Sequence, residues 1–362
     1  MRWKPILNEM TPYKPGKSTE DVKKEFGLTD IVKLASNENP YGQPKEAAAL
    51  LKNPYELEIY PDGYAASLRE KIASTLAIDT EELLFGSGSD EIIVIIARAL
   101  LGEGTNTICA TPTFPQYRHH AVIEGAEVKE IPLTAEGEHD LPKFLAAIDE
   151  HTSVIWLCSP NNPTGNIIDS TDLQNFLKEV PEDILVVLDE AYYEYITDET
   201  FEDTTHLFRT YPNVLSLRTF SKAFGLAGLR VGYAIGNETV ISQLNKARSP
   251  FNNTSISLAV AEKAFDDKAF IARCRELNAE QKKRFKQFAK EHQLHLYPSE
   301  ANFVLMQVPN TMTANEASDC LLEKGYIVRS GDLLGSPGYI RVTVGTPEQN
   351  DGFFEAFKTL FS

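Results

Sequence analysis

The lysine at position 222 stands in a setting that is unusual for this residue type. It follows the apolar run Val214–Leu217, and Ala223 and Phe224 come directly after it. A lysine among apolar neighbours and near other cations has a lowered pKa, which an amine nucleophile needs. Arg230 follows eight residues later, with two glycines between, and its guanidinium suits two-point binding of a phosphate. The segment therefore indicates an activated amine beside an anion site.

Asp189 is a carboxylate that is expected to be buried and therefore to need a charged partner. This residue directly follows the apolar run Ile184–Leu188, so it is expected at the buried end of a strand. Burial of a carboxylate is costly unless a cation or a hydrogen-bond donor pairs with it. The position therefore favours a charged partner such as a protonated ring nitrogen, with Tyr192 beside it.

Two more polar segments lie next to predicted strands or helices. The stretch Gly86–Glu91 leads into an apolar helix expected over Ile92–Leu101, and Ser89 suits its cap. Free N–H groups at such a helix start bind anions. The loop Ser159–Gly165 follows another strand, and the amide of Asn162 can donate into a crevice. Because open parallel sheets bind ligands at the ends of their strands, we expect these segments to meet at one site.

Together these groups match the needs of pyridoxal phosphate. This cofactor requires an amine that bonds to it and an acid against its ring nitrogen. It also requires donors to its phosphate, a donor to its ring hydroxyl and an aromatic face. The residues that supply these parts, in the same order, are Lys222, Asp189, Gly88–Asp90 with Arg230, Asn162 or Tyr192, and Phe114.

Composition and charge narrow the classes of protein and partner. The chain has 362 residues, 42% of them hydrophobic, which predicts roughly two globular domains. A net charge of −17 makes it a poor general binder of nucleic acid or anionic lipid. The four cysteines are far apart, which excludes a disulfide scaffold and favours a reducing cytoplasm. Neither a signal peptide nor a membrane span is expected.

Short apolar runs alternate with helical or loop segments in the middle of the chain. This order predicts an α/β fold with a mainly parallel sheet, covered on both faces, and a smaller α+β domain after it. We expect an irregular N-terminal arm over 1–45 that packs on the small domain or on a partner subunit, a large cofactor-binding domain over 46–264 and a small C-terminal domain over 265–362. The expected strands are Thr107–Ala110, Val154–Cys158, Ile184–Leu188, Val214–Leu217, Gly232–Ile235, Ala301–Val308, Tyr326–Arg329 and Tyr339–Val344; the expected helices include Tyr64–Leu76, Ile256–Gln293 and Pro347–Phe361.

Other common motifs are absent from the sequence. No phosphate-binding P-loop and no GxSxG nucleophile motif is present, and Gly86–Glu91 begins like a dinucleotide motif but ends in Glu. His292 and His295 lack a third ligand, and His119 and His120 are adjacent, so no metal site is expected.

The order and spacing of these motifs resemble a known family. The chain is similar to the fold-type-I, pyridoxal-phosphate-dependent aminotransferases, and within them to the histidinol-phosphate aminotransferase branch, over essentially its whole length. The matching segments are Leu34–Pro40, Tyr60–Asp62, Gly86–Glu91, Asn161–Gly165, Asp189–Tyr192, Ser221–Phe224 and Arg341–Gly345.

The resemblance implies a role for each residue of the cofactor site. Lys222 would hold the cofactor and shuttle the proton, and Asp189 would keep its ring nitrogen protonated. Asn162 and Tyr192 would bond the ring oxygen, and Phe114 would stack on the ring where relatives often have Tyr or Trp. The residues around the cofactor phosphate would be Gly88, Ser89, Asp90, Thr219, Ser221 and Arg230.

The resemblance also implies substrate contacts and a homodimer. Tyr60 matches a tyrosine that reaches the cofactor phosphate from the neighbouring subunit. Arg341 matches the arginine that binds the anionic group of the amino substrate. Tyr13 and Arg329 resemble the substrate-phosphate contacts of this branch, and Asn39 lies in a matching segment and is expected to bind substrate.

The implied reaction exchanges an amino group between histidinol phosphate and 2-oxoglutarate, giving imidazole acetol phosphate and glutamate. Four alternatives remain open for the function. They are an aromatic amino-acid aminotransferase, an enzyme with dual specificity, a pyridoxal-dependent decarboxylase of a phosphorylated amino acid, and a non-catalytic regulator. The substrate contacts have an alternative as well, in which Arg329 pairs with a surface carboxylate such as Asp332 and Tyr13 only packs.

Overall fold

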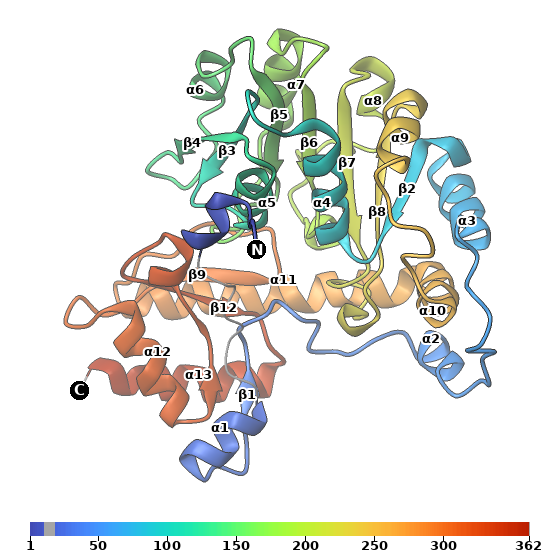
Figure 1. Ribbon diagram of the computed structural model, residues 1–362. Helices are drawn as coiled ribbons and strands as arrows, with labels where there is room; N and C mark the ends of the chain where they lie inside the picture. Colours follow the sequence, from blue (N-terminus) through green and yellow to red (C-terminus); the bar gives the residue numbers. More distant parts are fainter. Residues whose placement is uncertain (11–18, 362) are drawn as a thin grey trace.

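The computed structural model describes residues 1–10 and 19–361 (Figure 1). Its main element is a seven-stranded sheet with the order β2-β8-β7-β6-β5-β3-β4. The pairs formed by β3–β7 among themselves are parallel, and β8 runs antiparallel to both of its neighbours. The strands are β2 (Leu83–Gly86), β3 (Asn106–Thr111), β4 (Glu127–Pro132), β5 (Thr152–Cys158), β6 (Leu185–Asp189), β7 (Val214–Thr219) and β8 (Gly232–Gly236).

The five strands expected here from apolar runs are confirmed, each within a few residues. Two strands of the sheet, β2 and β4, were not among those expected. β2 has four residues before a helix, and β4, with the sequence EVKEIP, lies at the sheet edge with mostly exposed or half-buried side chains. A buried strand needs continuous apolar residues, whereas an edge strand does not, so β4 carries a weaker signal.

Helices cover both faces of this sheet, as the alternation of its side chains requires. In β5, Val154 and Trp156 belong to the core on one face, whereas Ile155 and Leu157 belong to the core on the other. The helices of the chain are α1 (Thr19–Phe26), α2 (Lys45–Leu50), α3 (Ala66–Leu76), α4 (Ser89–Leu100), α5 (Gln116–Glu124), α6 (Leu141–Ala146), α7 (Ser170–Glu179), α8 (Leu207–Thr210), α9 (Glu238–Asn245), α10 (Ser255–Asp266), α11 (Lys268–Glu291), α12 (Ala314–Glu323) and α13 (Pro347–Lys358).

A second body of structure lies below the large sheet in Figure 1, and the long helix α11 contributes Phe285 and Phe288 to its core. This second body contains an antiparallel sheet with the order β11-β12-β9 and an aromatic core around Phe285, Phe353 and Phe357. Its strands are β9 (Phe303–Gln307), β10 (Tyr326–Ile327), β11 (Arg329–Ser330) and β12 (Tyr339–Thr343). The domain boundaries given above stay a prediction.

Three expectations about local structure were wrong. The strand expected over Tyr326–Arg329 is two short strands, β10 and β11, which belong to different sheets. The first forty residues are not wholly irregular, because α1 forms there and β1 (Val32–Lys33) pairs in parallel with β10. The helical stretch over 256–293 is two helices, separated at Asp267. The Asp267 side chain accepts a hydrogen bond from the Phe270 N–H, so it ends one helix and caps the next.

One edge of the large sheet collects the polar segments. β3, β5, β6 and β7 run in the same direction and therefore end at this edge. β8 runs the other way, so the residues just before it, Arg230 included, also lie there. The topology thus brings together loops that are far apart in sequence. Within the described residues, no helix is both long and apolar enough to cross a bilayer.

A buried ion pair lies beneath this edge. The Arg218 Nε donates to Glu190 Oε2 over 3.1 Å, and each side chain is 3% exposed. The Arg218 guanidinium also lies 3.6 Å from the ring centroid of Tyr193, and Thr204 donates to the Glu190 carboxylate. These contacts compensate for the loss of water around both charges.

Replacing Arg218 by Met is expected to destabilise the chain by about 3–5 kcal/mol, because the Glu190 carboxylate would stay buried without its cation. Urea unfolding measures the loss. The matched control is Arg118→Met, which breaks an exposed pair with Glu130 and should cost less than about 1 kcal/mol. Similar small losses for both variants would contradict this account.

Candidate active site

A cavity of about 560 Å³ lies at the polar edge of the large sheet, between that sheet and the strands β11 and β12. It brings together most of the residues singled out from the sequence. Those that line it are Ser89, Asp90, Phe114, Asn162, Asp189, Tyr192, Thr219, Ser221, Lys222, Arg230, Arg329 and Arg341.

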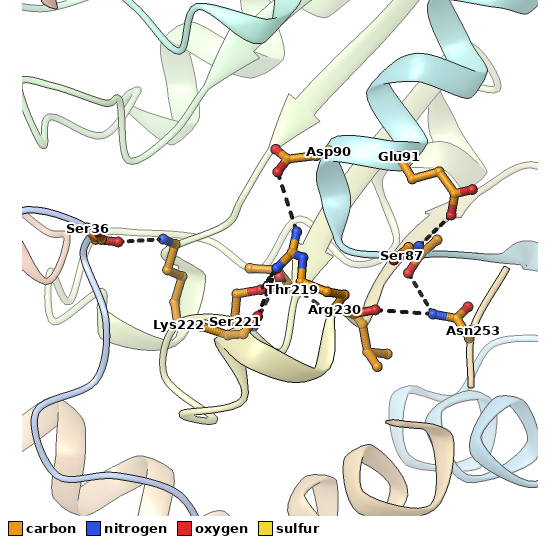
Figure 2. Close-up of polar contacts among 12 residues, drawn as sticks. Ser36, Ser87, Asp90, Glu91, Thr219, Ser221, Lys222, Arg230 and Asn253 are labelled. Atoms are coloured by element: carbon orange, nitrogen blue, oxygen red, sulfur yellow. Dashed lines mark hydrogen bonds and ion pairs between the residues drawn. The ribbon is translucent and has the colours of Figure 1, made fainter. Parts of the chain in front are cut away.

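Lys222 reaches into this cavity from the loop after β7. Its Nζ donates to the carbonyl oxygen of Ser36 over 3.3 Å and lies 5.6 Å from the ring centroid of Tyr192 (Figure 2). Loss of water around the amine, followed by the like charge of Arg341, lowers the pKa of Lys222 to about 8. The neutral, nucleophilic form of this amine is therefore far more populated near neutral pH than in an ordinary lysine.

Asp189 is the last residue of β6 and is 3% exposed. Its Oδ2 accepts a hydrogen bond of 2.6 Å from the Tyr117 hydroxyl, and its Oδ1 accepts one from the Ala191 N–H. Burial raises the pKa of this carboxyl to about 6, while the two hydrogen bonds act against that rise. A cation against Asp189 would hold it ionised, which fits the partner expected from the sequence.

The N-terminus of α4 and the side chain of Arg230 form an anion cradle. The Arg230 Nη1 donates to the Ser221 hydroxyl over 3.0 Å, and its Nη2 lies 3.4 Å from the Asp90 carboxylate (Figure 2). The φ of Gly88 is 80°, a region that favours glycine, and a Cβ there would also displace the Arg230 guanidinium. The first N–H groups of α4 receive no side-chain cap from Gly88 and are available to an anion.

The backbone of Arg230 in this cradle is strained, and neighbouring residues hold it in that conformation. Its φ of 52° lies in the left-handed region, which non-glycine residues seldom adopt outside sites where surrounding structure enforces it. Asn253 helps to hold this conformation, because its Nδ2 donates to the carbonyl oxygens of both Gly86 and Arg230 (Figure 2). The cradle is thus set before any ligand enters.

Two arginines face each other on the opposite wall. Arg329 in β11 and Arg341 in β12 are direct partners in the antiparallel register, so their side chains lie on one face of the sheet. Arg341 is 7% exposed and donates to Asn162 Oδ1 over 2.6 Å and to the Ala35 carbonyl oxygen over 2.7 Å. Arg329 makes no side-chain hydrogen bond or ion pair with any described residue, so its predicted pairing with Asp332 is not seen.

Asn162 and Tyr192 both retain a donor toward the cavity. The Asn162 oxygen accepts from Arg341, so its amide nitrogen stays available. The Tyr192 hydroxyl accepts from Asn37 Nδ2 over 3.0 Å and so keeps its own hydrogen to donate. Either group suits the ring oxygen of the cofactor expected from the sequence.

Three of the expected site residues do not line the cavity. The Asn39 amide donates to the carbonyl oxygen of Ala223, so it holds the lysine loop from behind. Tyr60 is 78% exposed and stacks on Phe251 with ring centroids 4.8 Å apart. Gly88 contributes by leaving space for Arg230. Tyr13 lies outside the described residues.

Sequence reasoning missed two residues that act on the site. Tyr117 binds the Asp189 carboxylate, and Asn37 binds the Tyr192 hydroxyl. Asn37 lies in the segment Leu34–Pro40 that marked the family resemblance, so that segment was a usable signal. Tyr117 had only its position three residues after Phe114 as a signal.

The donor set fits pyridoxal phosphate. An amine with a lowered pKa, a buried carboxylate, an anion cradle and two spare donors surround one cavity with Phe114 in its wall. Among the residues that the structure describes, no group of three or more His, Cys, Asp or Glu side chains could hold a metal ion. The amine, the buried carboxylate and the anion cradle around the cavity fit an organic phosphate.

Comparisons with known proteins agree with this chemistry. The chain is 53% identical over 357 residues to histidinol-phosphate aminotransferase of Geobacillus sp. (strain WCH70), covering 98% of this chain and 97% of that protein. It is 53% identical over 352 residues to the Bacillus subtilis (strain 168) protein of the same name, covering 97% of each.

Solved structures show the same fold. Histidinol-phosphate aminotransferase from Sinorhizobium meliloti, in complex with pyridoxal-5'-phosphate, superposes with a TM-score of 0.88 at 24% identity, covering 99% of this chain and 97% of that chain. Aspartate aminotransferase from Thermus thermophilus, with maleate, gives a TM-score of 0.85 at 23% identity, covering 99% and 100%. Residues 29–357 match the family model for aminotransferase class I and II. The chain therefore belongs to the class I and II aminotransferases, with the histidinol-phosphate aminotransferases as its relatives at about half identity.

Proposed function

We propose that this enzyme transfers an amino group between histidinol phosphate and 2-oxoglutarate with pyridoxal phosphate as its cofactor. The product pair would be imidazole acetol phosphate and glutamate, a step of histidine biosynthesis. The names of the relatives support the phosphorylated substrate. When bound, pyridoxal phosphate supplies an electron sink for the bonds at the α-carbon of the amino substrate.

One observation supports the substrate assignment most: Arg329 in β11 and Arg341 in β12 lie directly opposite each other. Like charges directly opposite on neighbouring strands destabilise a sheet. A phosphate monoester relieves this repulsion, because it carries nearly two negative charges and accepts bidentate hydrogen bonds from guanidinium groups. A neutral aromatic amino acid offers only its carboxylate to the same pair.

Lys222 and Asp189 are the proposed chemical groups. The Lys222 amine, with its lowered pKa, is suited to take a proton from the substrate α-carbon and to return it to the cofactor. Asp189 would pair with the ring nitrogen, and that cation would in turn keep the carboxylate ionised. Phe114 would stack on the ring, and Ser89, Thr219, Ser221 and Arg230 would hold the cofactor phosphate.

The same anion site would serve both half-reactions. In one, Arg341 would bind the phosphate of histidinol phosphate, and in the other the carboxylate of glutamate, because a guanidinium pairs with either group. The apolar side chains of Val328 and Leu334 also line the cavity and would accept an aromatic ring, so aromatic amino acids are the second candidate donors.

We also propose a homodimer that works in the cytoplasm. Tyr60 stacks on Phe251, and both residues are exposed. The segment 51–64 carries further exposed apolar side chains, which on a monomer would lie in water: Leu51, Leu57, Ile59 and Tyr64. In the proposed dimer a second copy covers this segment, and Tyr60 reaches the partner's cofactor phosphate. The four cysteines are free thiols, which favours a reducing compartment.

We expect Lys222→Ala to abolish borohydride-stable attachment of pyridoxal phosphate, as read by mass spectrometry. In the wild-type apoenzyme, attachment should accelerate as pH rises through about 8, because the neutral amine is the reactive form. The control is Lys282→Ala, which removes a half-buried lysine whose Nζ instead donates to the Ser299 carbonyl oxygen. Attachment at another lysine, or a midpoint near the ordinary 10.5, would contradict the assignment.

Arg329→Ala should lower kcat/KM for histidinol phosphate roughly ten- to a hundredfold, because a hydrogen bond to a charged group contributes about 1.5–3 kcal/mol. Phenylalanine as the donor is the internal control, and its kcat/KM should fall much less. An unchanged ratio between the two donors would remove the phosphate role and favour the aromatic aminotransferase.

Mixed dimers test the contribution of Tyr60. Neither Lys222→Ala nor Tyr60→Phe alone should show full activity, but their heterodimer would contain one intact site formed by Lys222 of one subunit and Tyr60 of the other. Activity should therefore rise on mixing and subunit exchange. Sedimentation as a monomer, or unchanged cofactor affinity in Tyr60→Phe, would argue against the shared site.

A further inference from the structure

We infer that Tyr117 is a positioning residue that aims the Asp189 carboxylate at the cofactor ring and keeps it ionised. The inference rests on the proposed function, in which Asp189 pairs with the ring nitrogen. Its basis is the 2.6 Å hydrogen bond from the Tyr117 hydroxyl to Asp189 Oδ2, formed between α5 and the end of β6.

The ring of Tyr117 is held on two sides. It stacks on Trp156 with ring centroids 4.9 Å apart and an interplanar angle of 11°, and it meets Phe114 edge-on at 5.6 Å. The Trp156 Nε1 is fixed in turn, since it donates to Thr107 Oγ1 over 2.8 Å. With Tyr117 only 1% exposed, its hydroxyl has one well-defined position, directed at Asp189.

The arrangement also decides which partner carries the proton. Burial and the nearby Asp189 charge raise the pKa of Tyr117 well above its ordinary value, so the phenol stays protonated and donates. The other titratable groups near Asp189 oppose its charge: Asp90 from α4 and Glu190 from its own loop raise its pKa. The Cys158 thiol, opposite in β5, is itself neutral because burial raises its pKa to about 12.

Tyr117 and the Ala191 N–H are thus the two hydrogen-bond donors that stabilise the anion in the described structure. In the proposed complex, one proton lies between the cofactor ring nitrogen and the Asp189 carboxylate. Removing the Tyr117 hydroxyl would shift this proton from the ring nitrogen toward the Asp189 oxygen. The Tyr117→Phe variant removes that one hydrogen bond and keeps the ring between Trp156 and Phe114.

The decisive measurement is the ¹⁵N NMR shift of the ring nitrogen in labelled pyridoxal phosphate bound to the holoenzyme. In the wild type we expect the shift of a protonated ring at neutral pH. In Tyr117→Phe it should move toward the value of a neutral pyridine. We expect kcat to fall about tenfold or more, the range of one lost hydrogen bond to a charged group, with KM for histidinol phosphate within about twofold.

Tyr195→Phe is the matched control. Tyr195 is buried, lies outside the cavity, and its hydroxyl has no hydrogen-bond partner among the described residues. This variant should keep the wild-type ¹⁵N shift and kcat. A wild-type shift and kcat in Tyr117→Phe would overturn the inference, as would equal changes in both variants. The NMR shift needs no substrate, so a wild type inactive on histidinol phosphate would refute the proposed function separately.

Discussion

The confinement of several cations in one cavity of a strongly acidic protein is the constraint on which the rest of the site depends. The chain carries a net charge of −17, yet four cationic side chains share a space of about 560 Å³ with two carboxylates. Loss of water around the amine, followed by the like charge of Arg341, lowers the pKa of the lysine, and the arginines are suited to bind anionic ligands. The four cations are Lys222, Arg230, Arg329 and Arg341.

The fold distributes these charges over two walls of the cavity. The large sheet carries Lys222 and the Arg230 cradle at the ends of its strands, while β11 and β12 carry the facing arginines on the other wall. A cofactor phosphate would neutralise the first wall and a substrate phosphate the second. The reacting amine and the buried Asp189 would then lie between two satisfied anion sites, with little water.

Much of this arrangement could be predicted from the sequence, because apolar runs that end in polar loops mark the strands of a parallel sheet. That pattern located Asp189, Asn162 and Lys222 correctly at one edge. It could not locate Tyr117, whose contact with Asp189 is made across tertiary structure by a residue that reads as an ordinary helical aromatic. The facing of Arg329 and Arg341 was likewise hidden, since register between distant strands depends on the turn and on packing.

The most direct test of the central claim is a crystal structure of the enzyme with pyridoxal phosphate and histidinol phosphate bound together. The account predicts that the substrate phosphate lies between the guanidinium groups of Arg329 and Arg341, with its oxygens within hydrogen-bond distance of both. A substrate phosphate that instead faces solvent, or one bound at the Arg230 cradle, would contradict it.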